Sequence, residues 1–291
     1  MDVMPPVFRY TDGVLYVLLP TVTLPVYALI IKHFLSNKSF KSNISYQIMA
    51  TLGIFDCLLQ VGFFGCGVFT LSGSVFSPFI EKLILNLVNA SWNAAFPTIL
   101  VLALNRFVVI ADIGFISPTF YKFCLGLATL YWVAFFSICL TPSAGLIYRL
   151  DYGVGSYNFN LPWNRTIDYV EYYVNVICVV LTFFLYVLTV LVLAYKRRSV
   201  SSNQSVITKR EFKILTQAVV IFLGCSGDLL MSYYGTKLFS RSRLECLALM
   251  LLLEATFGLM NPIIYLSMNR KISKVSIIST SKLQINGIYN K

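Results

Sequence analysis

The chain has 291 residues, of which 57% are hydrophobic and 12% are charged, and its formal net charge is +11. A water-soluble domain carries roughly 25% charged residues, so this chain lacks the polar side chains that a soluble surface needs, and its mean hydropathy of +0.75 agrees. Composition therefore excludes an ordinary soluble domain and favours a protein of the lipid bilayer.

Seven apolar stretches are each long enough to cross a membrane, which takes about 20 consecutive apolar residues. In chain order they are residues 13–35, 44–69, 82–111, 122–142, 169–195, 212–234 and 245–268. No connecting segment is long enough for a separate soluble domain. We expect an all-α bundle of seven transmembrane helices that forms a single domain over residues 1–291.

Basic residues predict which helix ends face the cytoplasm. With the amino terminus outside, the inner segments hold sixteen Lys and Arg residues and the outer segments seven, as the positive-inside rule requires. The tail at 269–291 is then cytoplasmic, and we expect it to begin with a short amphipathic helix near 269–279. Topology and attraction to anionic lipid account for the positive charge, so we do not expect nucleic-acid binding.

Polar residues inside the second and third spans are the first candidate site residues. Asp56 lies near mid-membrane, where a carboxylate must be protonated, paired or ion-bound. Asn86, Asn89 and Asn93 recur at spacings of three and four, so they share one face of the third helix, close to Trp92. This face either lines a ligand pocket or holds helices together by hydrogen bonds.

The outer loop at 143–168 contains no cysteine, so no disulfide can pin it. It does contain the sequon Asn164-Arg165-Thr166. The other sequons lie inside or within a span, so Asn164 is the predicted glycosylation acceptor.

Asp228 and Glu254 are further acids, in the sixth and seventh spans, and no Lys or Arg lies deep in any span to pair with them. Each carboxylate must be protonated, hydrogen-bonded to the asparagine face of the third helix, or matched by a cationic ligand such as a small amine. The competing prediction is a neutral apolar ligand bound near Trp92, with both acids protonated.

Two short strings near helix ends predict a switch. Arg106 follows Asn105 at the end of the third span, where a charge near hydrocarbon costs about 2.5 kcal/mol or more unless it faces water or a partner. Asn261-Pro262-Ile263-Ile264-Tyr265 ends the seventh span. Its proline removes a backbone donor, and its tyrosine hydroxyl can bond different partners in two arrangements.

These motifs resemble those of the seven-helix G-protein-coupled receptors. Asn105-Arg106-Phe107 is similar to their Asp/Glu-Arg-Tyr motif, and the segment from Asn261 to Tyr265 fits their Asn-Pro-x-x-Tyr motif. Leu52-Gly53-Ile54-Phe55-Asp56 resembles their second-helix segment with its buried acid, and Trp132 their fourth-helix tryptophan. The runs 45–56 and 261–272 resemble nematode serpentine chemoreceptors, especially class T or the related class X.

The resemblance implies a rhodopsin-like bundle in the plasma membrane that binds a small odorant or metabolite outside and activates a heterotrimeric G protein inside. It implies that Arg106 switches from an intramolecular restraint to the G protein, and that Asn261, Pro262 and Tyr265 form part of the switch. It also places Asp56 and Asn261 in one polar network, for which we favour bound water over sodium.

Four departures from the wider family limit what can be carried over. The sixth span has neither Pro nor Trp, and no Cys lies near the top of the third span. Asn105 replaces an acid, so no carboxylate at that position can restrain Arg106 by titrating. The seventh span has no Lys, which excludes a retinal Schiff base.

The main alternative is a multi-span transporter or channel for a small solute, although the sequence has no inverted repeat or pair of broken helices. A second alternative is a membrane protein with a structural or trafficking role that has lost signalling. The intact Arg106 and Asn261-Pro262 motifs argue against it. We expect no enzyme, cofactor or metal site, because no metal-ligand cluster, nucleophile triad or phosphate-binding loop occurs.

Overall fold

The computed structural model describes residues 5–37, 40, 42–114, 116–199, 209–239 and 243–263. Seven helices among these residues are long and apolar enough to span a membrane, and the predicted all-α, seven-helix fold is confirmed. Tyr265, the expected amphipathic helix near 269–279 and the tail at 269–291 lie outside the described residues.

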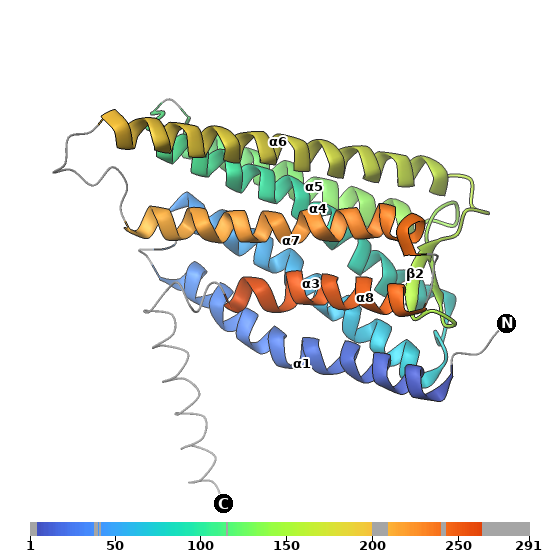
Figure 1. The fold of residues 1–291 in the computed structure, drawn as a ribbon. Helices are drawn as coiled ribbons and strands as arrows, with labels where there is room; N and C mark the ends of the chain where they lie inside the picture. The colour runs from blue at the N-terminus through green and yellow to red at the C-terminus, as the bar shows by residue number, and fades with distance from the viewer. Residues whose placement is uncertain are drawn as a thin grey trace, which may run out of the picture.

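The helices are, in chain order, α1 (Pro6–Ser36), α3 (Ile44–Ser72), α4 (Pro78–Ala111), α5 (Pro118–Leu140), α6 (Asn164–Ser199), α7 (Lys209–Phe239) and α8 (Arg243–Leu253). A π-helical segment, η1 (Glu254–Met260), continues α8, and the two make up most of the seventh span. The helices run side by side, with α1 and α6 along opposite edges of the bundle (Figure 1).

A β-hairpin lies at the end of the bundle where α1 begins and α6 starts (Figure 1). Its antiparallel strands are β1 (Leu146–Arg149) and β2 (Val154–Tyr157). We call this the hairpin end, and the end where α6 stops and α7 begins the distal end.

Serine–proline pairs define where α4 and α5 begin. Ser77 accepts a hydrogen bond from the backbone N–H of Ile80 at 3.2 Å, and Ser117 accepts one from Phe120 at 3.4 Å. A proline follows each serine at the first helical position, where its missing N–H costs nothing. The preceding helix, α3, ends at Gly73, whose φ of 67° lies in the left-handed region that glycine adopts easily.

The centre of the bundle is α4. In the most apolar stretch of α4, 67% is buried inside the protein, against 22% for the corresponding stretch of α5 and 28% for that of α6. Helix α4 packs against α3, α5, α6, α7 and β1. The peripheral helices instead expose large apolar side chains such as Phe123, Leu130, Phe183 and Leu191. Such a surface suits contact with lipid, whereas the polar side chains of α4 must find partners inside the protein.

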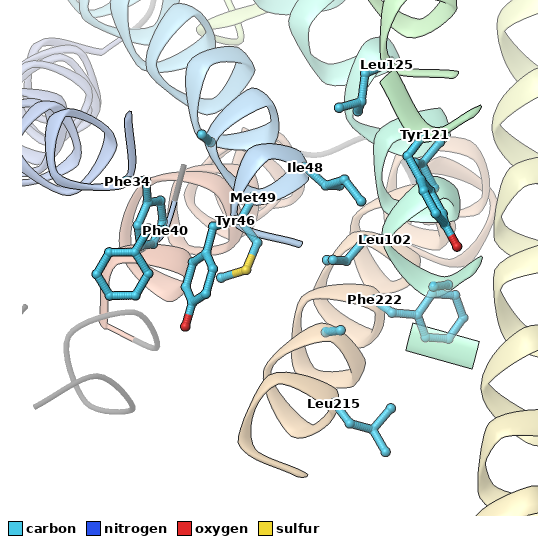
Figure 2. Packing of buried hydrophobic residues seen from close by; sticks show 14 of the residues in the cluster. Phe34, Phe40, Tyr46, Ile48, Met49, Leu102, Tyr121, Leu125, Leu215 and Phe222 are labelled. Atoms are coloured by element: carbon cyan, nitrogen blue, oxygen red, sulfur yellow. The ribbon is translucent and has the colours of Figure 1, made fainter. Parts of the chain in front are cut away.

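A cluster of buried apolar residues closes the distal end, and side chains from α1, α3, α4, α5 and α7 meet in it (Figure 2). Its aromatic part includes Phe40 and Tyr46, whose ring centroids lie 4.6 Å apart in an edge-on arrangement. Leu102 of α4 and Phe222 of α7 belong to the same cluster. The contacts stabilise the bundle through close packing, because lipid tails are as apolar as these side chains.

Hydrogen bonds hold the hairpin on the bundle. The loop at 143–168 contains no cysteine, so a disulfide cannot do this. The backbone N–H of Tyr148 donates to Glu81 of α4 at 2.6 Å, and its hydroxyl shares a 2.6 Å hydrogen bond with Thr70 of α3. Lys82 donates to two carbonyl oxygens of the turn at 141–144, at 2.7 and 2.9 Å. All seven cysteines are free thiols.

Asn164 completes this attachment from the start of α6. Its side chain is fully buried, donates to the carbonyls of Gly145 and Asn158 at 2.7 Å each, and accepts from the N–H of Gly145 at 2.9 Å. A glycan on the amide nitrogen and these contacts exclude one another. The packing therefore argues against the glycosylation of Asn164 that the sequon predicts.

We expect Asn164→Ala to lower the free energy of unfolding by about 2 kcal/mol, because it leaves buried backbone groups of Gly145 and Asn158 without partners. Asn160→Ala, an exposed asparagine in the same loop, should have little effect. Thermal unfolding of the two purified variants beside wild type measures the difference. Equal midpoints for the two variants, or a wild-type mass that a glycosidase reduces, would contradict the account.

Candidate functional site

Arg106 lies almost fully buried at the distal end of α4, with 1% of its surface exposed. Its Nη2 donates to the hydroxyl of Ser45 on α3 and to the amide oxygen of Asn105 at 2.5 Å. Ser45 donates in turn to the same amide oxygen at 2.8 Å. Two neutral acceptors therefore hold the guanidinium, and Asn105 provides one of them at the position where the resembling receptors have an acid.

Two tyrosines extend this arrangement to α5 and α6. Tyr121 and Tyr186 approach the Arg106 guanidinium closely enough to interact with its charge. Both hydroxyls are buried and make no hydrogen bond of regular geometry within the described part of the chain, although the Tyr121 hydroxyl interacts with the side chain of Asn105. Lys196 donates to the carbonyl of Ile110 at 2.9 Å and ties the distal end of α6 to α4. The site thus holds a buried cation beside hydroxyls that are available for new bonds.

Asp56 and Asn261 meet in the middle of the bundle. Asp56 Oδ2 accepts from the amide of Asn261 at 2.7 Å and from the hydroxyl of Tyr27 at 2.5 Å. The contact joins α1, α3 and the turn that follows η1. The resemblance to the receptor family implied the pairing of Asp56 with Asn261. The sequence did not indicate Tyr27, because nothing in the pattern of α1 distinguishes that tyrosine from its apolar neighbours.

The π-helical segment η1 lies directly before Asn261 and the buried Pro262. Proline has no N–H to donate and its ring crowds the carbonyl four residues earlier, so the helix before it loses its regular α pattern. Gly258 lets η1 approach α3 closely, since a Cβ there would meet the side-chain amide of Gln60. Widened turns of this kind are frequent at functional positions.

Asp228 and Glu254 are buried, as expected, but they do not reach the asparagine face of α4. Their carboxylate oxygens make no hydrogen bond of regular geometry among the described residues, although Thr256 interacts with Asp228. Glu254 lies within electrostatic range of Tyr16 on α1. Among the described residues no hydrogen bond of regular geometry joins either acid to the asparagine face, so the structure contradicts that alternative for the two acids.

A network of hydrogen bonds at the hairpin end centres on Glu171 of α6, which is 4% exposed. One carboxylate oxygen accepts from the hydroxyl of Tyr157 on β2 and from the amide of Asn89 on α4 at 3.2 Å. The other accepts from the hydroxyl of Tyr233 on α7 at 3.2 Å. Four elements that are distant in sequence therefore meet at one carboxylate.

The Tyr157 hydroxyl keeps its proton throughout the physiological pH range and therefore acts as a hydrogen-bond donor. Burial, and then the neighbouring Glu171 carboxylate, raises the pKa of its hydroxyl well above the usual value. Its oxygen also accepts from Asn89 at 2.7 Å. Tyr157 thereby fastens β2 to both α4 and α6.

The rest of the asparagine face contributes in two ways. Asn93 donates to the backbone carbonyl of Asn89 at 2.9 Å and accepts from Asn175 of α6 at 2.7 Å. Asn86, by contrast, is 1% exposed and neither amide atom has a partner within the described residues. The indole N–H of Trp92 is likewise buried and unpartnered there, and its ring lies 6.4 Å from that of Tyr233.

Sequence reasoning missed Glu171, Tyr157 and Ser45. The sequence does not single out Glu171, because it lies only two residues inside the predicted start of the fifth span at 169–195, beside the outer loop. The start of α6 at Asn164 places it more than one turn inside the helix and turns it toward α4. A helical projection extended to the residues just before the fifth span, with a search for acidic residues on its inward side, could have found Glu171.

Comparison with known proteins extends these observations. The family model described as serpentine type seven-transmembrane chemoreceptor Srt, of the G-protein-coupled receptors, matches residues 4–286. No curated protein matches the chain significantly. The crystal structure of squid rhodopsin has a similar fold, with a TM-score of 0.80, 13% sequence identity, and coverage of 98% of this chain and 88% of that one. At this identity the similarity concerns the fold alone.

Tyr27→Phe should lower the free energy of unfolding by about 1–3 kcal/mol, since it removes one of the two hydrogen bonds that Asp56 accepts. Tyr16→Phe is the matched control, because the Tyr16 hydroxyl is equally buried on α1 but lacks a partner among the described residues. Thermal unfolding in detergent compares the two. An effect of Tyr16→Phe as large as that of Tyr27→Phe would show that the Asp56 contact is not the cause.

Proposed function

Because this chain belongs to the Srt family of serpentine seven-transmembrane chemoreceptors, we propose that it binds a small odorant or metabolite on its outer side and activates a heterotrimeric G protein through its cytoplasmic face. GTP exchange occurs on the partner, and the receptor itself is neither an enzyme nor a holder of a cofactor or metal. The observation that carries the proposal is the buried guanidinium of Arg106 at the distal end of the central helix.

The chain is a multi-pass membrane protein. In the proposed orientation the distal end is cytoplasmic and the hairpin end faces outward at the plasma membrane. The sixteen basic residues that the sequence places on the distal side, against seven on the other, support this orientation. Lipid is therefore a permanent partner of the helices.

Release of Arg106 is the central step of the proposed activation. Ser45 and Asn105 are neutral acceptors, so each of these two contacts costs less to break than a contact with a buried carboxylate would. The freed fork can then donate several hydrogen bonds at once to backbone carbonyls of a G-protein segment. Tyr121 and Tyr186 are close enough to stabilise Arg106 in the new position.

The seventh span provides the second part of the switch. Asn261 is tied to Asp56, and Pro262 weakens the helix beside it. In the proposal Tyr265, which lies beyond the described residues, changes partner when α7 and the seventh span move. Asp56 with Asn261 and bound water forms the polar hinge of this movement.

The ligand binds near the hairpin end of α4 in this proposal. Asn86, Asn89, Trp92 and Asn93 lie together along that part of the helix, and Asn86 and Trp92 retain buried polar atoms that a ligand can satisfy. Asp228 and Glu254 lie in the neighbouring spans as further candidates. The hairpin covers this region and α7 borders it, so occupancy there can bias the position of α7.

Arg106→Ala should abolish ligand-driven GTP exchange while the receptor still reaches the cell surface, because alanine removes the cationic fork. Lys122→Ala, which removes an exposed positive charge from the same end, should retain exchange. Exchange is measured on a co-expressed G protein with an agonist found by screening odorants and small metabolites. Arg106→Lys separates loss of charge from loss of the fork. Wild-type exchange by a well-expressed Arg106→Ala receptor would refute this role.

Tags at the amino terminus and in the loop at 143–168 should be labelled on intact cells. Tags at 199–205 and at the carboxy terminus should be labelled only after permeabilisation, since the positive-inside rule places both in the cytoplasm. Labelling of the carboxy terminus on intact cells would reverse the orientation or change the number of spans.

A further inference from the structure

Glu171 differs from the other buried acids in how completely the surrounding structure is built around it. Donors from β2, α4 and α7 converge on its two carboxylate oxygens. Asp228 and Glu254, in contrast, make no hydrogen bond of regular geometry among the described residues. We propose that Glu171 is the recognition group for the ligand, and that the ligand is a small protonated amine.

The electrostatics of the site favour a cation. The structure gives Glu171 no ion-pair partner among the described residues. Its donors there are two phenols and the side-chain amides of Asn89 and Asn93, all of them neutral. Neutral hydrogen bonds offset only part of the cost of placing a carboxylate in an apolar bundle. An ammonium group adds charge as well as donors, and charge-assisted hydrogen bonds are roughly twice as strong as neutral ones.

The rings beside the carboxylate favour an organic cation over a metal ion. The Tyr233 ring lies 4.9 Å from that of Tyr172 and 6.4 Å from that of Trp92. Aromatic faces attract alkylammonium groups and also pack against the apolar body of such a ligand. No group of acids, histidines and cysteines that could hold a metal occurs in the described residues.

Unused polar atoms on α4 provide an independent sign of an occupant. Asn86 lies one turn of α4 before Asn89 and is 1% exposed. Both of its amide atoms nevertheless lack a partner among the described residues. The Trp92 indole N–H is in the same condition at 7% exposure. Buried polar groups are rarely left unbonded without a reason. A ligand with a polar group at its far end can bond either of them.

Binding of an ammonium group would loosen the attachment of α7. The ammonium donates to the Glu171 oxygens in place of the Tyr157 and Tyr233 hydroxyls, which belong to the hairpin and to α7. The exchange removes the hydrogen bond between Tyr233 of α7 and Glu171 of α6, so that the contact between the Tyr172 and Tyr234 hydroxyls is the α6–α7 hydrogen bond that stays at this end among the described residues. This step rests on the proposed receptor function, because it links occupancy at the hairpin end to a helix that reaches the distal end.

The assignment to Glu171 replaces the sequence-based expectation that an amine pairs with Asp228 or Glu254. Among the described residues, neither of those acids makes a hydrogen bond of regular geometry with the hairpin or with the asparagine face. Substitutions at the three acids therefore discriminate between the two assignments.

The test measures binding to the purified full-length receptor in lipid nanodiscs, by the shift of its thermal unfolding midpoint. The probes are matched pairs of one carbon skeleton: phenethylamine with phenethyl alcohol, and isoamylamine with isoamyl alcohol. A saturating amine should raise the midpoint by about 5 °C, and its alcohol should not. Glu171→Gln should weaken amine binding tenfold or more. Asp112→Asn, which removes an exposed acid at the distal end of the bundle, should bind as wild type does.

Several outcomes overturn the proposal: alcohols that stabilise as well as amines, no stabilisation by either amine, unchanged amine binding by Glu171→Gln, or loss of binding through Asp228→Asn or Glu254→Gln alone. GTP exchange is measured separately. GTP exchange driven only by neutral volatiles would contradict the amine site and support the receptor function. Amine binding that depends on Glu171 but stimulates no G protein keeps the site and removes the receptor function.

Discussion

The structure depends on the hydrogen bonds that polar side chains of α4 make with neighbouring helices inside an apolar bundle. Water is absent from the hydrocarbon region, so a polar group there must find its partner on a neighbouring helix. At the hairpin end Asn89 reaches a carboxylate on α6. Further along, Ser91 accepts from the Trp132 indole of α5 at 3.0 Å. At the distal end Arg106 bonds Ser45 of α3. These bonds fix which helices pack around α4.

The hairpin shows how a loop without cysteines is held in place. A disulfide would fix one point permanently, whereas Glu81, Lys82 and Asn164 hold the loop through hydrogen bonds that contribute about 1 kcal/mol each. Such contacts can open one at a time. Because Tyr157 belongs to the same hairpin and bonds Glu171, the cover of the proposed ligand site and its recognition group are one connected unit.

The sequence predicted the number of spans and the fold class, because hydropathy is a local property. The pairing of Asp56 with Asn261, 205 residues apart, was instead implied by the resemblance to the receptor family. It did not reveal the hairpin, whose short strands carry no clear alternation, nor the contacts of Glu171. It also suggested a glycan on Asn164, since a sequon does not report burial. Partners that lie 82 residues apart, such as Asn89 and Glu171, become visible only when the helices are packed.

The central claim is that occupancy at the hairpin end of α4 controls the arginine cluster at its distal end, and through it a G protein. The most direct measurement reconstitutes the wild-type receptor and a G protein in the same vesicles, and follows nucleotide exchange and solute uptake while the outer ligand is added. The account predicts faster GTP exchange with no uptake. Solute entering the vesicles while the exchange rate stays constant would contradict it and indicate a transporter.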